Sequence, residues 1–147
     1  MKIKEENKNN FLSALQKVSR ALKSNSLDCC KMCGGINEKE LHIIEYIGQY
    51  KNVTMSDIAD NLDAPLSTLT NIVDKLVEKK YLSREHGGDD RRVINVMLAE
   101  NGKTAYKVVG AKKKQIAEKL FPKFSEKELV SFIKHLNILA SSLAADA

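Results

Sequence analysis

Short hydrogen-bonding side chains in residues 65–80 form the first pattern in this sequence that could do chemistry. Apolar residues at spacings of three and four make one stripe of a 3.6-residue helix: Leu66, Leu69, Val73 and Leu76. The other face is polar and carries Ser67, Thr68, Asn71, Asp74, Lys75 and Glu78. Small polar groups on the first turns of a helix suit contacts to DNA base edges and phosphates. Taken alone, such a helix is more often a solvated amphipathic one.

A charged turn follows this segment. Residues 86–92 read His-Gly-Gly-Asp-Asp-Arg-Arg, and the two glycines favour a tight turn. The turn lies between residues 81–84 and residues 93–98, and in the latter the apolar residues alternate as in a strand. The pattern predicts a β-hairpin with a polar tip. The alternative is a solvent-exposed turn held by an Asp–Arg pair that contributes little stability.

The three cysteines, Cys29, Cys30 and Cys33, lie within a span of five residues. The Cys30-x-x-Cys33 spacing suits a dithiol switch or part of a metal site, with His42 or Asp28 as a further ligand. A single pair at this spacing is weak support, because structural zinc sites normally show two such pairs. Unreactive thiols are the third reading, and the sequence leaves all three open.

The elements around these residues read as a helix-turn-helix followed by the hairpin. Thr54 is predicted to cap a helix from Met55 to Leu62, with Asp57 at its third position. The turn at residues 63–65 ends in a proline, which the first turn of the next helix tolerates. Two helices joined so tightly, and then a hairpin, predict a winged helix over residues 53–98.

Helices are predicted on both sides of this lobe. Residues 9–23 form the first, and the Gly34-Gly35 pair ends the link that follows. A second begins after Asn37, and two more lie in residues 100–145. Their broad apolar faces favour a dimerisation layer made of residues 9–50 and 100–145. We therefore expect one mainly α domain over residues 1–147, with a small β-hairpin wing and N- and C-terminal dimerisation helices.

Composition narrows the function classes. The 147 residues are 43% hydrophobic and carry a net charge of +5, which fits a globular chain. Residues 51–95 nevertheless hold seven basic and eight acidic residues, so bulk charge does not mark the lobe as a DNA-binding site. The N-terminus lacks an apolar signal region, which favours a cytoplasmic protein that contacts no membrane. The sequence shows no glycine-rich phosphate loop and no nucleophile with a visible base, so we expect no enzyme activity.

In these elements and in its residues, the chain resembles the MarR family of winged-helix transcriptional regulators. The most specific part of the resemblance is the string Asp57-Ile58-Ala59, Leu62, Ser67-Thr68-Leu69-Thr70, Val73-Asp74-Lys75-Leu76 and Lys80-Tyr81-Leu82. The second part is Asp90-Arg91-Arg92 with Leu98 and Gly102, which looks like the D-x-R wing signature of the family. The resemblance implies a homodimer on pseudo-palindromic operator DNA. It further implies a repressor that a small ligand, an oxidant or a metal releases, with no cofactor required.

The resemblance also implies roles for single residues. Arg92 matches the wing arginine that enters the minor groove, and Asp90 matches the acid that orients it. Arg91 is expected to contact a phosphate. The DNA-contacting face is matched by Ser67, Thr68, Thr70, Asn71 and Lys75, with Arg84 on the strand that follows. For Thr70, packing at the helix edge is the alternative.

Two departures from the family pattern concern Asn71 and Ala99. Asn71 stands where many members carry arginine, which should weaken or redirect the recognition of guanine. Ala99 replaces the usual threonine, so a capping hydroxyl is missing there.

Two further expectations concern partners. The resemblance implies an effector pocket between the dimerisation helices and the lobe, with Tyr46 and Met32 among its lining, although ordinary core packing would explain these residues equally. The acidic balance of residues 51–95 supports a different function, a winged helix that contacts another protein and binds no specific DNA.

Overall fold

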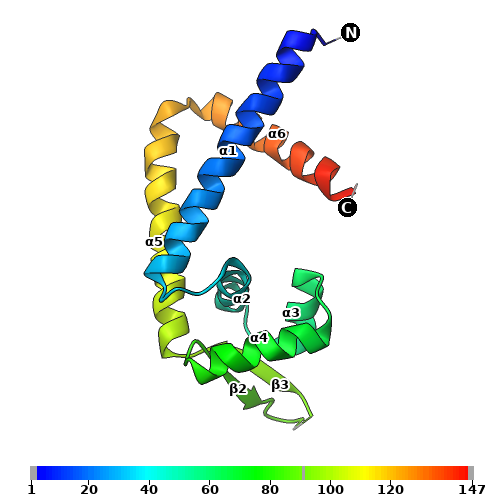
Figure 1. Ribbon diagram of the computed structural model, residues 1–147, viewed down its shortest axis with the longest axis vertical. Coiled ribbons are helices and arrows are strands. Elements are labelled where there is room, and N and C mark those ends of the chain that lie inside the picture. Colours follow the sequence, from blue (N-terminus) through cyan, green and yellow to red (C-terminus); the bar gives the residue numbers. More distant parts are fainter. Residues whose placement is uncertain (1–2, 91, 146–147) are drawn as a thin grey trace. The chain divides into compact units, whose positions relative to one another are not determined.

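Six α-helices, a short 3-10 helix and a three-stranded sheet make up the part of the chain that the structure describes (Figure 1). The structure is a computed structural model and describes residues 3–90 and 92–145. The chain divides after Val109 into two compact units. The mainly α fold with a small hairpin that the sequence predicts is confirmed.

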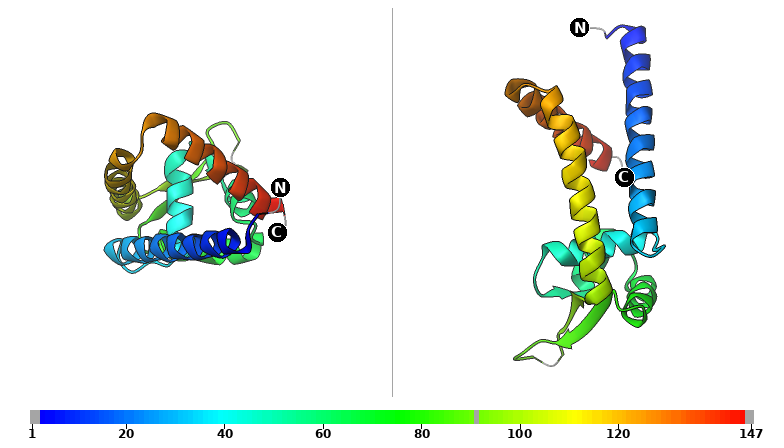
Figure 2. Two further views of the ribbon diagram at one scale, coloured as in Figure 1. Left: turned by 90° about the horizontal axis from the view of Figure 1, so that it is seen from above. Right: turned by 90° about the vertical axis from the view of Figure 1, so that its left-hand side faces the viewer.

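The first unit contains the lobe that matters for function. Its elements are α1 (Glu5–Met32), α2 (Glu38–Gln49), β1 (Val53–Thr54), α3 (Met55–Leu62), α4 (Leu66–Glu78), β2 (Leu82–His86), β3 (Ile94–Leu98) and the first turns of α5 (Glu100–Leu120). The strands lie in the order β1-β3-β2, and both pairings are antiparallel. In the hairpin, Leu82 lies opposite Leu98 and His86 opposite Ile94, so the hairpin projects from the lobe as a wing (Figure 2).

Local sequence explains the helix-turn-helix. The Thr54 hydroxyl accepts the backbone N–H of Asp57, and the Asp57 carboxylate accepts the backbone N–H of Thr54 at 2.8 Å. α3 is followed by its C-cap residue Asp63, whose φ of 47° turns the chain sharply toward α4. In α4, Leu69 and Val73 are fully buried, as the stripe predicts. Leu66 differs from the prediction, because at the first turn of α4 its side chain is 52% exposed.

The first helix is longer than predicted. α1 continues through Ser24-Asn25-Ser26 to Met32, so the cysteines lie at its end and not in a link. The Asn25 side chain donates to the Ala21 carbonyl at 2.9 Å, which satisfies the amide within the exposed helix. The chain leaves the helix only at Gly34 and Gly35, with φ of 92° and 77°.

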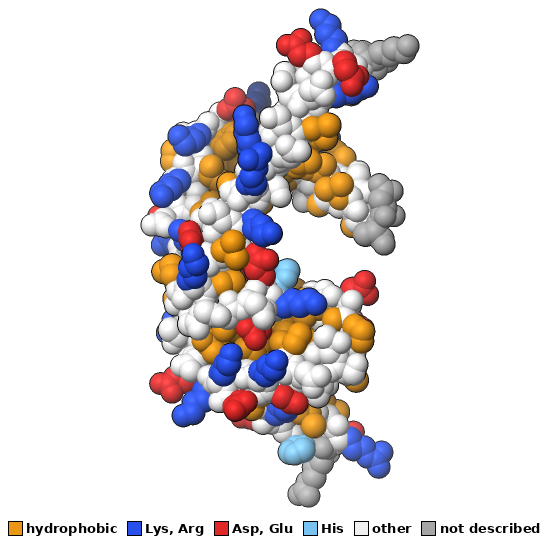
Figure 3. Space-filling view, in the orientation of Figure 1, with side chains coloured by type: hydrophobic (Ala, Val, Ile, Leu, Met, Phe, Trp, Pro, Cys, Tyr) orange, Lys and Arg blue, Asp and Glu red, His pale blue; other side chains and the backbone are white. Residues whose placement is uncertain are grey.

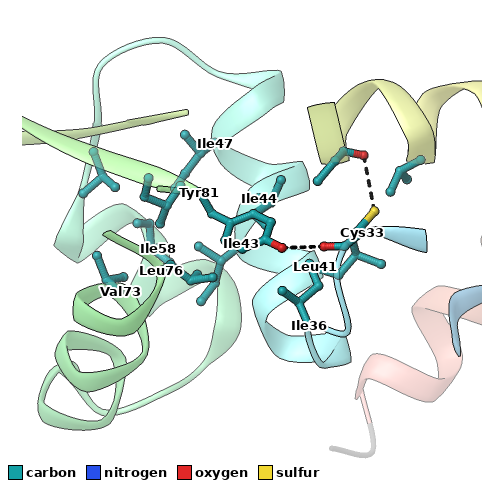
Figure 4. Packing of buried hydrophobic residues seen from close by; sticks show 14 of the residues in the cluster. Cys33, Ile36, Leu41, Ile43, Ile44, Ile47, Ile58, Val73, Leu76 and Tyr81 are labelled. Carbon is teal, nitrogen blue, oxygen red and sulfur yellow. Dashed lines mark hydrogen bonds between the residues drawn. The ribbon is translucent and has the colours of Figure 1, made fainter. Parts of the chain in front are cut away.

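Tyr81, at the junction of α4 and β2, joins this helix end to the lobe. Its hydroxyl donates to the Cys33 carbonyl at 2.6 Å (Figure 4). Its own carbonyl accepts the backbone N–H of Ala99 at 2.9 Å, next to Gly102 of α5. A side chain at Gly102 would overlap that carbonyl oxygen, which explains a glycine here. The end of α4 is thereby fixed from two sides.

The second unit holds the rest of α5, the 3-10 helix η1 (Phe121–Lys123) and α6 (Glu126–Ala145). A capping box is present at Ser125, where the Glu128 carboxylate accepts the Ser125 backbone N–H at 2.8 Å. The rings of Phe124 and Phe132 stack with centroids 5.5 Å apart. Among the described helices, none has the length and apolar character that crossing a membrane requires.

Candidate nucleic-acid interface

The outward face of α4, made of Ser67, Thr68, Asn71 and Lys75, is exposed throughout. The fully buried side chains on the opposite side of the helix hold it in place. Pro65 occupies the N-cap position of α4, no side chain among the described residues caps the helix, and its first turn contains no acid. Its first backbone N–H groups are therefore available to an anion such as a phosphate.

Thr70 is exposed, contrary to the alternative that it packs at the helix edge. Its hydroxyl donates to the Leu66 carbonyl at 2.8 Å. The donor of this hydroxyl is thus used within the helix, and the methyl group is the part of Thr70 with no polar partner.

Arg84 of β2 forms an ion pair with Asp74 of α4, with 2.6 Å between guanidinium nitrogen and carboxylate oxygen. Their side chains are 31% and 53% exposed. The pair fastens the wing to α4 and directs Arg84 toward the helix. Sequence reasoning placed Arg84 among the DNA contacts but did not find this partner, because nothing in the local pattern relates α4 to the strand after it.

The tip of the wing is shaped by Asp90. Its carboxylate accepts the backbone N–H of Arg92 at 2.9 Å, and its carbonyl accepts the backbone N–H of Val93 at 3.1 Å. Asp90 therefore fixes the backbone that presents Arg92, whose side chain is exposed. Arg91, which the sequence assigns to a phosphate contact, lies outside the described residues.

Charge over this region is mixed. Figure 3 shows basic and acidic side chains interspersed over the part of the lobe that carries α4 and the wing. The balance of seven basic and eight acidic residues in residues 51–95 agrees with that view. Affinity for DNA would therefore depend on a few placed cations and on the α4 N-terminus.

The three cysteines are buried, with exposed fractions of 5%, 5% and 7% for Cys29, Cys30 and Cys33. All three are free thiols. Burial, with the charges of Glu38 and neighbouring groups, raises the pKa of the Cys30 thiol, and burial with the other two cysteines raises that of Cys33. The Cys33 thiol lies 3.8 Å from the Ala105 carbonyl oxygen (Figure 4).

His42, the suggested metal ligand, is exposed on α2. Within residues 3–90 and 92–145, no three side chains of the His, Cys, Asp or Glu type come together as a metal site would require. The structure thus does not join His42 to the cysteines in one copy of the described chain.

Of the two residues expected to line an effector pocket, Met32 lines a cavity and Tyr46 does not line the same one. Met32 lines a cavity of about 230 Å³, together with Cys33, Gly34, Tyr81, Asn101, Thr104, Ala105 and Val108. Tyr46 is not among these lining residues, and its ring lies against that of Tyr50 with centroids 4.9 Å apart.

Comparison with known proteins shows that the chain is similar to transcriptional regulators. Residues 36–94 match the MarR family. The chain is 26% identical over 96 residues to the HTH-type transcriptional repressor MdtR of Bacillus subtilis, which covers 65% of this chain and 62% of MdtR. It is also 26% identical over 113 residues to the HTH-type transcriptional regulator PchR of the same organism, covering 75% of this chain and 67% of PchR.

Solved structures agree. FabT of Streptococcus pneumoniae, in complex with DNA, superposes with a TM-score of 0.79 at 26% identity, covering 98% of this chain and 100% of FabT. The YusO protein of Bacillus subtilis has the same fold, with a TM-score of 0.71 at 22% identity, covering 95% of this chain and 99% of YusO. The family match covers α2, α3, α4 and β2 and ends at Ile94, the first residue of β3, so it includes the elements that carry most of the candidate interface. Over this winged-helix region, the chain is similar to transcriptional regulators of the MarR family.

Proposed function

We propose that this protein is a sequence-specific DNA-binding transcriptional regulator. The observation that carries the proposal is the outward face of α4, polar and uncapped at its N-terminus, beside a wing whose tip Asp90 holds in shape. A recognition helix enters the major groove while Arg92 reaches the adjacent minor groove. FabT, whose fold is similar along its whole length, is bound to DNA in its structure.

We also propose that the regulator is a homodimer. α1 and α6 each leave large apolar side chains exposed, among them Leu22 at 61%, Val130 at 62% and Leu143 at 60%. Such apolar faces are rare on monomers and are typical of interfaces. A two-fold dimer would present two copies of α4 to half-sites about 34 Å apart, which is one turn of DNA and the reason to expect a pseudo-palindromic operator.

Repression, and release by an effector, complete the proposal. MdtR is named as a repressor, which supports the same sense of control here. The cavity of about 230 Å³ beside Met32 and Tyr81 is the place where a small molecule would contact Tyr81, which lies between α4 and β2. An oxidant or a metal acting on the cysteines would affect the same region, because the backbone carbonyl of Cys33 accepts a hydrogen bond from the Tyr81 hydroxyl.

Fluorescence anisotropy with duplex DNA from upstream of the protein's own gene tests the proposal. Binding should weaken steeply with salt, because cations on the protein displace counterions from phosphates. Arg92→Ala should reduce affinity about tenfold, the loss expected for one contact of roughly 1.4 kcal/mol. Lys127→Ala, which removes an exposed cation from α6, is the matched control and should bind as the unmodified protein does.

Two outcomes would contradict the proposal. Unchanged affinity and salt slope for Arg92→Ala would remove the wing from the interface. Absence of specific duplex binding, in random-site selection as well as with the upstream DNA, would favour the second candidate function, a winged helix that contacts a protein. The acidic balance of residues 51–95 favours that candidate.

A further inference from the structure

Asn71 occupies the centre of the outward face of α4. It follows Leu69 by two residues and precedes Val73 by two, and both of these are fully buried. At about 100° per residue, its side chain leaves the helix on the side opposite the core. Asn71 is exposed. In a groove-bound helix this is the position nearest to the base edges.

The neighbours of Asn71 leave it few competitors for those edges. α4, from Leu66 to Glu78, contains no arginine. The guanidinium of Arg84 on β2 is paired with Asp74 at 2.6 Å, and the Thr70 hydroxyl donates to the Leu66 carbonyl of its own helix. Lys75 remains as a cation on a flexible stem, which suits a phosphate better than a two-point base contact.

The chemistry of the amide selects the base. A primary amide places an N–H donor and a carbonyl acceptor side by side. Adenine presents the complementary pair in the major groove, an acceptor at N7 and a donor at N6, whereas guanine presents two acceptors, N7 and O6. An arginine would match guanine and an asparagine matches adenine.

From this placement we propose that Asn71 reads an adenine, so that each operator half-site has an A·T pair under the middle of α4. The inference rests on the proposed function, because it names the base that the same interface selects. It assigns to this chain a preference different from the guanine recognition that an arginine at this position would provide.

Random-site selection followed by base-analogue substitution tests this inference. Selection with the unmodified protein should enrich one invariant A·T pair in each half-site. Replacing that adenine by 7-deazaadenine removes the N7 acceptor but keeps base pairing, and should weaken binding about 5- to 20-fold. Replacing the pair by G·C should weaken binding about 5- to 150-fold.

Variants assign the effect to the residue. In Asn71→Ala, the natural adenine and its 7-deaza analogue should bind equally, and the enrichment at this position should vanish. Asn71→Arg should shift the selected base toward guanine. Gln49→Ala, which removes an exposed amide from the end of α2, is the matched control and should keep the adenine preference.

The outcomes separate this inference from the function beneath it. Specific binding in which Asn71→Ala retains the full 7-deaza penalty, or in which the unmodified protein selects guanine under α4, overturns the role of Asn71 and leaves the regulator intact. Failure to enrich any duplex sequence overturns the regulator, and the inference falls with it.

Discussion

At the scale of single residues, the thiols of Cys30 and Cys33 show how position controls reactivity. Both lie at the C-terminal end of α1, where the helix dipole disfavours a negative charge. Burial and the nearby charge of Glu38 raise the pKa of the Cys30 thiol, and burial with the other two cysteines raises the pKa of the Cys33 thiol. Because the thiolate is the species that attacks oxidants and electrophiles, this environment slows the reaction of both thiols with such reagents. A redox switch here stays a prediction.

We therefore predict that at pH 7.5 the folded protein reacts with iodoacetamide more slowly than the urea-unfolded chain does. In the folded state the two thiols stay protonated to a higher pH than in the unfolded chain. Their contribution to the free energy of unfolding is therefore fully present below the ordinary thiol pKa of 9.0 and is lost as pH rises above it. The double variant Cys30→Ser, Cys33→Ser should show a shallower alkaline decline in urea unfolding between pH 8 and 10.5. Equal alkylation rates in the two states would contradict this account.

At the scale of elements, two glycines in α5 make a matched pair. A side chain at Gly102 would overlap the carbonyl oxygen of Tyr81, whereas no described residue lies within 4 Å of the corresponding position at Gly110. Gly102→Ala should lower the free energy of unfolding by about 1–3 kcal/mol, because helix and backbone must separate. Gly110→Ala should raise it by roughly 0.5–1 kcal/mol, because alanine favours the helix.

Urea unfolding of both variants at one fixed protein concentration measures these changes, since concentration matters if the chain dimerises. If Gly102→Ala were as stable as the unmodified protein, the junction of α5 with Tyr81 would be looser than the structure shows. If Gly110→Ala were strongly destabilised, Gly110 would pack against a group that the described residues of one chain do not include, such as a second copy.

The same elements show what the sequence could predict. The capping boxes at Asn37, Thr54 and Ser125, and the bounds of α3, follow from local signals that need no tertiary partner. The two-residue strand β1 was not predicted, because Val53–Thr54 is a strand only through pairing with β3 some 40 residues later. The end of α1 was misplaced because Ser24-Asn25-Ser26 reads as a break, although a side-chain bond to the helix backbone accommodates it.

The candidate site divides in the same way. The polar face of α4 was predictable from spacing, because a buried stripe at Leu69 and Val73 determines which residues point outward. The ion pair between Asp74 and Arg84 was not predictable, because it depends on how the strand after α4 crosses the helix. Asp90 was assigned to the Arg92 side chain, whereas the structure shows its bond to the Arg92 backbone.

At the scale of the whole molecule, exposed apolar residues are the feature that a single chain does not explain. On α6, Val130, Ile133 and Leu136 are 62%, 48% and 45% exposed, and on α1, Phe11 and Leu22 are 54% and 61% exposed. Each helix is amphipathic and long, and each would bury these side chains in a second copy. The proposed dimer therefore accounts for sequence patterning that the lobe itself does not need.

Leu136→Asp should for this reason weaken the dimer, because burying an unpaired carboxylate in an apolar interface is unfavourable. In analytical ultracentrifugation the variant should sediment as a monomer at concentrations where the unmodified protein is a dimer. Its affinity for a full operator should fall by about 10²- to 10⁴-fold, the range that linking two binding sites provides, while its weak affinity for one half-site persists. Gln49→Asp adds the same charge to an exposed position on α2 and should leave both measurements unchanged. A Leu136→Asp protein that still sediments as a dimer and binds the full operator tightly would exclude this face of α6 from the interface and restrict the search to α1.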